Sequence, residues 1–169
     1  GNVFSIASGG WSTPGTWSET SGGPSCSCLP TSLDNVIIEN NFIVTMNSIG
    51  TVKSLTIQTG GRANWSSALT TNIGSGGINI TSTGDITGSA NGILTTTGGL
   101  ILDKVLTSTS VTIKTQAVAG QTITGTGTLA KLDISANTTN NGTITVTNSL
   151  ISSVSSTLTQ GASATLTYT

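Results

Sequence analysis

The chain contains no histidine and very few charged residues, and this scarcity excludes several classes of protein. Lys and Arg together number 5 and Asp and Glu 6 among 169 residues, which gives a formal net charge of -1. Five dispersed cations cannot neutralise a nucleic-acid backbone. Six scattered carboxylates without histidine leave almost nothing for acid–base catalysis or transition-metal binding. We therefore predict a protein that is not an enzyme, has no catalytic residue, and binds no cofactor, metal or nucleic acid.

Long apolar runs and prolines are also scarce. No stretch approaches the roughly 18–20 apolar residues of a membrane span, so we predict no membrane insertion. Disordered chains usually combine low hydrophobicity with high charge or many prolines, whereas this chain is 34% hydrophobic, 7% charged and has 3 Pro. It is rich in Thr (34), Ser (24) and Gly (22), with Ile, Leu and Val placed singly among them, as in β-strands. The low Lys and Glu content favours a location outside the cytoplasm.

The two cysteines, Cys26 and Cys28, are separated by a single serine. Thioredoxin-type chemistry uses Cys-x-x-Cys, and tetrahedral zinc needs four ligands, so neither function fits this spacing. The pair forms either a tight disulfide or two thiols in an N-terminal loop, and both alternatives remain open.

Apolar triplets recur along the chain after Leu33. Their leading residues are separated by 19, 23, 22, 23, 21 and 22 positions: Val36, Leu55, Ile78, Leu100, Ile123, Ile144 and Leu166. A second and looser series contains Ile43-Val44, Ile86, Val111, Leu132 and Val154. A period of about 22 residues with several strand signals per repeat is typical of solenoids, in which stacked repeats share one core. Glycine pairs 60–61, 76–77 and 98–99 are expected at the corners.

The sequence therefore predicts an all-β fold, a parallel and right-handed β-helix or β-solenoid of about six to seven turns with an N-terminal cap. Residues 1–33 are expected to form the cap and its loop, and residues 34–169 the solenoid. The open edge of the first turn needs protection, which we assign to Trp11, Trp17, Pro14 and Pro30; a sugar-stacking platform is the alternative role for the two Trp. Residues 164–169 look like mid-strand, so we expect the solenoid to continue beyond Thr169 or to self-associate end to end.

Carboxylates are the remaining candidates for calcium or polysaccharide chemistry, but each is isolated in the sequence. We expect them to be corner residues or exposed charges, two of them near a lysine (Lys104, Lys131): Asp34, Asp85, Asp103 and Asp133. Trp65 follows a glycine corner, and both a core and an exposed position remain open for it.

Thr-x-Thr triplets raise the alternative of an ice-binding surface, which needs outward threonines at one phase in every turn. The triplets fall at uneven positions, and only those around Ile123 and Ile144 share a phase. We therefore interpret threonine mainly as a neutral, β-favouring surface residue.

The N-terminal part of the chain, as far as Gly61, resembles a known group motif by motif. The motifs are Trp11-Ser-Thr-Pro-Gly-Thr-Trp17, Cys26-Ser-Cys-Leu-Pro30, Asp34-Asn-Val-Ile-Ile38, Val44-Thr-Met-Asn47 and Ser54-Leu-Thr-Ile-Gln-Thr-Gly-Gly61. This order is similar to the N-terminal region of large secreted cell-surface proteins of Bacteroidota. The resemblance implies export by a type IX secretion system, a cell-surface location, and a role in an adhesin or a gliding-motility filament.

We accordingly expect a non-enzymatic structural or adhesive part of a secreted bacterial surface protein. Its expected partners are the secretion and outer-membrane anchoring machinery and a surface glycan. A carbohydrate-binding module and a Thr-rich ice-binding solenoid are the alternatives.

Overall fold

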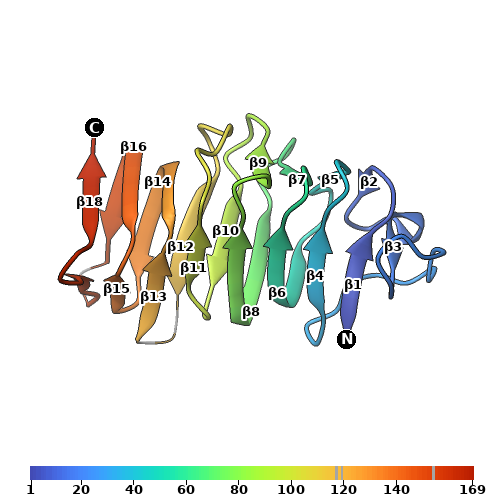
Figure 1. Cartoon of the computed structure of the whole chain (residues 1–169), viewed down its shortest axis with the longest axis horizontal. Helices are drawn as coiled ribbons and strands as arrows, with labels where there is room; N and C mark the ends of the chain where they lie inside the picture. The colour runs from blue at the N-terminus through green and yellow to red at the C-terminus, as the bar shows by residue number, and fades with distance from the viewer. Residues whose placement is uncertain (117, 119, 154) are drawn as a thin grey trace.

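Stacked β-strands run across the long axis of the molecule in the computed structural model, which describes residues 1–116, 118, 120–153 and 155–169 (Figure 1). The parallel strands form a β-solenoid of about seven turns, as the sequence predicts. Within the described residues there is no α-helix and one turn of 3-10 helix, η1 (Pro14–Thr16). Val154, expected in the second series of strands, lies outside the described residues.

Three strand-bearing faces surround the core, and we call them faces A, B and C. Face A begins at the N-terminus and contains one strand of every turn. Its strands are β1 (Asn2–Ser5), β4 (Asn35–Ile38), the second half of β6 (Gly50–Ile57), the second half of β8 (Thr70–Ile80), β11 (Leu100–Leu102), β13 (Gln121–Thr124), β15 (Thr138–Asn140) and β17 (Leu158–Gln160).

Face B follows face A along the chain in each turn. Its strands are β2 (Gly9–Gly10), β5 (Ile43–Thr45), β7 (Arg62–Asn64), β9 (Asp85–Thr87), the first half of β14 (Thr126–Ser135), the first half of β16 (Thr143–Ser152) and β18 (Thr165–Tyr168). Residues 105–108 join its two parts, because Ser108 N donates to Ile86 O and Leu106 N donates to Thr128 O, each at 2.9 Å.

Face C completes the turns between β4 and β16. It contains the first halves of β6 and β8, then β10 (Ile93–Thr96), β12 (Thr112–Gln116) and the second halves of β14 and β16. The long strands therefore turn a corner from one face to the next. Their pairing shifts register at those corners, between Val52 and Ser54 and between Leu129 and Lys131.

Inward-pointing aliphatic residues lie directly above one another along face A. The row consists of Val3, Val36, Leu55, Ile78, Leu100 and Ile123, all buried. The repeat predicted from the triplets is thus confirmed from Val36 to Ile123. The glycine corners are also confirmed, because Gly60, Gly77 and Gly99 have φ values of 75°, 74° and 89°, a conformation that glycine adopts without strain.

Beyond Ile123 the predicted repeat is wrong. Ile123 pairs with Asn140, which comes sooner along the chain than the predicted period allows, whereas Ile144 pairs with Gly127 on face B. Leu166 then pairs with Ile144 on that same face. The second predicted series likewise mixes two faces, since Ile86 lies on face B and Leu132 on face C. Apolar triplets on different faces look alike in the sequence. The step from Ile123 to Ile144 has nearly the expected length, although it leads from face A to face B.

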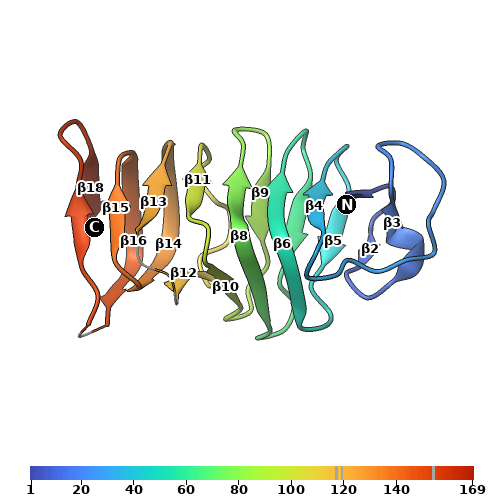
Figure 2. The same ribbon diagram turned by 90° about the horizontal axis from the view of Figure 1, so that it is seen from below.

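The solenoid begins earlier than residue 34, the boundary expected from the sequence. β1 pairs in parallel with β4, so the first residues form the opening turn, and the cap is an insertion between these two strands. β3 (Trp17–Ser18) pairs antiparallel with β1 and covers its outer edge, which would otherwise be free to pair with another chain. Figure 2 shows the cap segment folded over this end of the rod.

Candidate functional site

The two cap tryptophans pack against each other inside the N-terminal end. Trp17 is fully buried and Trp11 is 4% exposed, with ring centroids 5.4 Å apart at an interplanar angle of 78°. Trp17 Nε1 donates to the Trp11 carbonyl at 2.9 Å, which satisfies the indole nitrogen. Neither ring is presented to solvent, so they do not form a platform on which a sugar could stack.

The remaining cap residues lie on the outside of this tryptophan pair. Pro14 is exposed at the start of η1, and Pro30 is half-buried in the segment that returns to β4. Cys26 and Cys28 form a disulfide, and the Cys26 N–H donates to the Trp17 carbonyl at 3.0 Å. The disulfide loop is therefore attached through its backbone to β3.

A buried carboxylate that the sequence analysis did not single out joins the cap to the solenoid. Glu39 is 6% exposed and accepts hydrogen bonds from the Ser21 hydroxyl of the cap and from Gln58 Nε2 of the next turn, the latter at 3.1 Å. Its backbone N–H donates to Ser5 Oγ at 2.9 Å. The sequence signal for this role was the position of Glu39 directly after the apolar triplet Val36-Ile37-Ile38 of β4, where the chain enters a corner of the solenoid.

The four aspartates lie on separate turns. Asp34 Oδ1 accepts from the amino group of Gly1 at 2.9 Å, and Asp34 Oδ2 accepts from Thr31 N at 2.9 Å and Thr31 Oγ1 at 2.7 Å. Partial burial raises the pKa of Asp34, but these hydrogen bonds outweigh it, and the pKa lies below its ordinary value of 3.8. Asp34 therefore stabilises the end of the cap segment as a carboxylate.

The lysine neighbours expected from the sequence are not the partners found in space. Asp133 faces Lys114 at 3.9 Å, whereas Lys131 Nζ donates to Asn91 Oδ1 at 3.1 Å. Asp103 is exposed and accepts from the Thr126 N–H at 3.1 Å. Lys131 and Asp133 point to the same face of β14, but the register partner of Asp133 on the adjacent turn is Lys114, and this cross-strand neighbour is the one that it faces.

Acidic and cysteine side chains lie far apart across the described residues, apart from the disulfide-bonded Cys26 and Cys28. In the described part of the chain, no three of them lie close enough to hold a metal ion. The same residues contain no helix with the length and apolar character needed to cross a bilayer.

Trp65, for which core and exposed positions were both open, is fully buried. Its Nε1 donates to the Leu69 carbonyl at 3.2 Å. The ring fills the corner between faces B and C.

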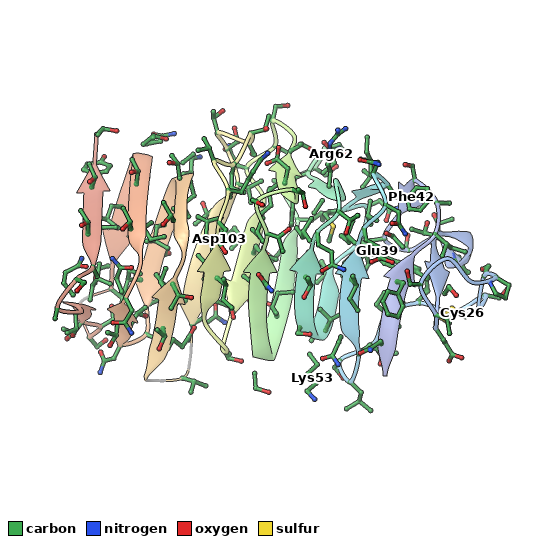
Figure 3. The ribbon with its side chains drawn as sticks, in the orientation of Figure 1. Cys26, Glu39, Phe42, Lys53, Arg62 and Asp103 are labelled. Atoms are coloured by element: carbon green, nitrogen blue, oxygen red, sulfur yellow. A yellow bond between two sulfur atoms is a disulfide. The ribbon has the colours of Figure 1, made fainter. Side chains whose placement is uncertain are left out.

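A groove with both polar and apolar lining runs over face B across β5, β7 and β9. It has a volume of about 530 Å³ and is lined by Ile43, Arg62, Asn64, Asp85, Thr87 and Thr107. Ile43, Arg62 and Asp85 occupy one row of adjacent turns, and Asn64 and Thr87 occupy the next row. Figure 3 shows Arg62 at the edge of the rod formed by face B, with Lys53 at the opposite edge.

Six threonines form an aligned array farther along face B. Thr126, Thr143 and Thr165 pair in one row, and Thr128, Thr145 and Thr167 pair in the second. All six are exposed or half-buried, while Ile144 and Val146 between them point inward. The prediction that only the triplets around Ile123 and Ile144 share a phase is wrong, because Ile123 lies on face A and Ile144 on face B. Turns of unequal length instead bring Thr126, Thr143 and Thr165 into register.

The chain was compared with protein-family models, curated proteins and solved structures, and none of them matches it.

Proposed function

We propose that this chain is a non-enzymatic structural and adhesive part of a secreted bacterial cell-surface protein or filament. The observation that carries the proposal is the continuous stack of parallel strands along the whole molecule (Figures 1 and 2). Such a stack buries one aliphatic core and satisfies its backbone through neighbouring turns, so it makes a stiff spacer without needing an active site.

The surface chemistry supports a location outside the cell. A net charge of -1 with a surface of Thr, Ser and Asn is typical of a neutral, hydroxyl-rich coat. Disulfides persist mainly in oxidising, extracytoplasmic compartments, and the Cys26–Cys28 bridge fits that environment. Together with the sequence resemblance, these features support secretion and anchoring machinery as partners.

Surface labelling of the source cells tests this proposal. An antiserum raised against residues 1–169 is expected to label intact cells, and protease added outside is expected to remove the label. Labelling only after lysis, with an intracellular control protein released in parallel, would overturn the proposal.

A second candidate function, ice binding, is favoured by the aligned threonine array. Adjacent turns are about 4.8 Å apart, and residues two apart on a strand are about 6.7 Å apart, so the six hydroxyl-bearing side chains form a regular two-dimensional net. Regular spacing of hydroxyl and methyl groups can order water on a flat surface.

Thermal hysteresis and partition into growing ice test the second candidate. The test variant is Thr145→Tyr, which places a bulky ring at the centre of one threonine row. The control is Thr51→Tyr, at an exposed threonine of β6 outside the array. Ice binding predicts activity in the unchanged protein and in the control, with loss in Thr145→Tyr. An unchanged protein without activity, or equal effects of both substitutions, would rule it out.

A further inference from the structure

We propose that the face B groove over β5, β7 and β9 binds a carboxylated saccharide. The inference rests on the proposed adhesive function and names the chemical class of the ligand. Its support is the set of groups that four successive turns bring together in the groove. They are a cation, a carboxylate, an amide, hydroxyls and an aliphatic side chain.

Arg62 supplies an available cation. Its side chain is exposed, and the ion pairs of the described residues are Gly1–Asp34 and Lys114–Asp133, so no carboxylate among them lies within 4.0 Å of it. This holds even though Asp85 occupies the adjacent register position on the next turn. A guanidinium has five N–H donors in a planar fork that matches a carboxylate in two-pronged fashion. The free fork of Arg62 therefore favours a ligand with a carboxylate.

Asp85 supplies a fixed acceptor beside that cation. It is 8% exposed, and Thr107 holds it with its backbone N–H at 2.9 Å and with its hydroxyl. A carboxylate offers about four acceptor positions, so two remain for groups of a ligand. Since the side chain is already held in place, binding loses little side-chain entropy. Sugar hydroxyls are donors of the kind that such an acceptor binds.

The second row of the groove adds neutral polar groups. Thr87 Oγ1 donates to Asn64 Oδ1 at 3.0 Å, which orients the amide and leaves its NH₂ group with two donors. Ile43 lies beside Arg62 on the preceding turn and is 36% exposed, which provides an apolar surface for the C–H face of a sugar ring.

The mixture of groups disfavours the other anionic ligands. Any anion on Arg62 is repelled by the neighbouring Asp85 carboxylate, and a sulfate ion, or a phosphate ion whose oxygens are mainly acceptors, offers Asp85 few donors to offset that repulsion. Nucleic acid requires many more cations than this chain possesses. A sugar acid instead presents its carboxylate to Arg62 and its hydroxyls to Asp85, Asn64 and Thr87.

Calorimetric titration of the 169-residue chain tests the proposal with matched probes. The probes are a galacturonic-acid oligomer, sialyllactose, and the neutral counterparts galactose oligomer and lactose. The variants are Arg62→Ala, Asp85→Asn and the control Lys53→Ala, which removes an exposed cation at the opposite edge (Figure 3). Circular dichroism of each variant establishes that it is folded. Should Asp85→Asn unfold, Arg62→Ala still tests the site at an exposed position, and Arg62→Gln repeats that test with a neutral side chain that keeps hydrogen-bond donors.

We expect at least one carboxylated probe to bind, and its neutral counterpart to bind at least about tenfold more weakly. Arg62→Ala is expected to weaken that binding by about tenfold, equivalent to about 1.4 kcal/mol, while Lys53→Ala leaves it within about twofold. Which probe binds distinguishes a uronic acid from a sialic acid. The proposal is overturned if no carboxylated probe binds, if neutral probes bind equally, or if Lys53→Ala weakens binding as much as Arg62→Ala.

The result is separable from that of the surface-labelling experiment. Labelled intact cells without saccharide binding would refute the groove ligand and leave the structural role standing. Saccharide binding by a chain found only inside cells would refute the surface role and leave the groove site standing.

Discussion

Gly92 lies directly against the indole ring of Trp65, so close that a β-carbon at this position would lie 2.0 Å from Cδ1 of the ring. The indole is fully buried and hydrogen-bonded to Leu69, and the neighbouring backbone leaves it little room to move. The Trp65 ring can therefore occupy its buried position only because Gly92, one turn away, has no side chain.

Gly92→Ala is expected to destabilise the protein by about 1–3 kcal/mol, because the added methyl group overpacks the corner beside Trp65. Urea unfolding followed by tryptophan fluorescence measures the change. Gly15→Ala is the matched control, since a β-carbon at Gly15 would meet nothing within 4 Å. Equal stabilities of the two variants would contradict the packing argument.

Thr71→Val is expected to stabilise the protein by about 1 kcal/mol, because valine keeps the shape of the side chain and removes an unpaired polar group. Thr71 points into the core from face C, and its buried hydroxyl has no hydrogen-bond partner among the described residues. Thermal melts of the variant and the unchanged chain measure the effect.

The control for that substitution is Thr96→Val on the same inward face. Thr96 Oγ1 donates to the Gly99 carbonyl at 3.1 Å and accepts from the Gly98 N–H at 3.0 Å, so its loss is expected to destabilise by about 1–3 kcal/mol. Changes of the same sign in the two variants would show that hydrogen bonding does not decide the effect.

Glu39→Ala is expected to cost about 1–3 kcal/mol, because it leaves the Gln58 amide and the Ser21 hydroxyl without their acceptor. The same substitution at the exposed Glu19 is expected to change stability by less than about 0.5 kcal/mol. Hydrogen exchange is expected to speed up most in the cap and β1 of Glu39→Ala. An increase spread evenly along the rod would contradict the assigned role in holding the cap.

Asp34→Asn is expected to lower stability near neutral pH by about 1 kcal/mol, because an amide has one acceptor oxygen where the carboxylate has two. The bond from Gly1 to one oxygen, or the two bonds from Thr31 to the other, must then be lost. The pKa of Asp34 is lower in the folded protein than in the unfolded chain, so its stabilising effect is fully present above the ordinary, unfolded pKa of 3.8. That effect disappears as the pH falls through the lower folded pKa. Urea titrations between about pH 7 and pH 2 should therefore converge for the two proteins at the acid end, and a constant difference would refute this linkage.

The solenoid fold could be predicted from the sequence because inward aliphatic residues recur once per turn in the regular strands of face A. Val36, Leu55 and Ile78 show this, since each is followed by an outward polar or aliphatic residue and a second inward one. The regularity ends at Asn140, which occupies the inward position above Ile123. Its side chain accepts from the Gly142 N–H and donates to Gln160 and the Thr165 carbonyl, so a polar residue is tolerated inside. Hydropathy cannot reveal such a position, because it depends on partners in other turns.

The candidate surfaces were less predictable than the fold. The turn from Thr126 to Thr143 is shorter than the turn from Thr143 to Thr165, so the alignment of these threonines follows from corner lengths that composition does not encode. The groove around Arg62 was missed for a related reason, because its charged residues come from different turns and each looks isolated in the sequence.

The orientation of the strands has a mechanical consequence for the rod. The strands lie across the long axis, so the hydrogen bonds between turns point along it (Figure 1). A pull applied between the two ends therefore opens one turn at a time, as a zip opens, and does not shear many strands together. Each turn that opens releases the segment of chain between two residues that are stacked on adjacent turns. This segment runs from Ile123 to Asn140 in a short turn and from Leu55 to Ile78 in a long turn. At full extension this is roughly 60 to 80 Å of slack per turn, so under tension the rod would act as an extensible tether that lengthens in steps.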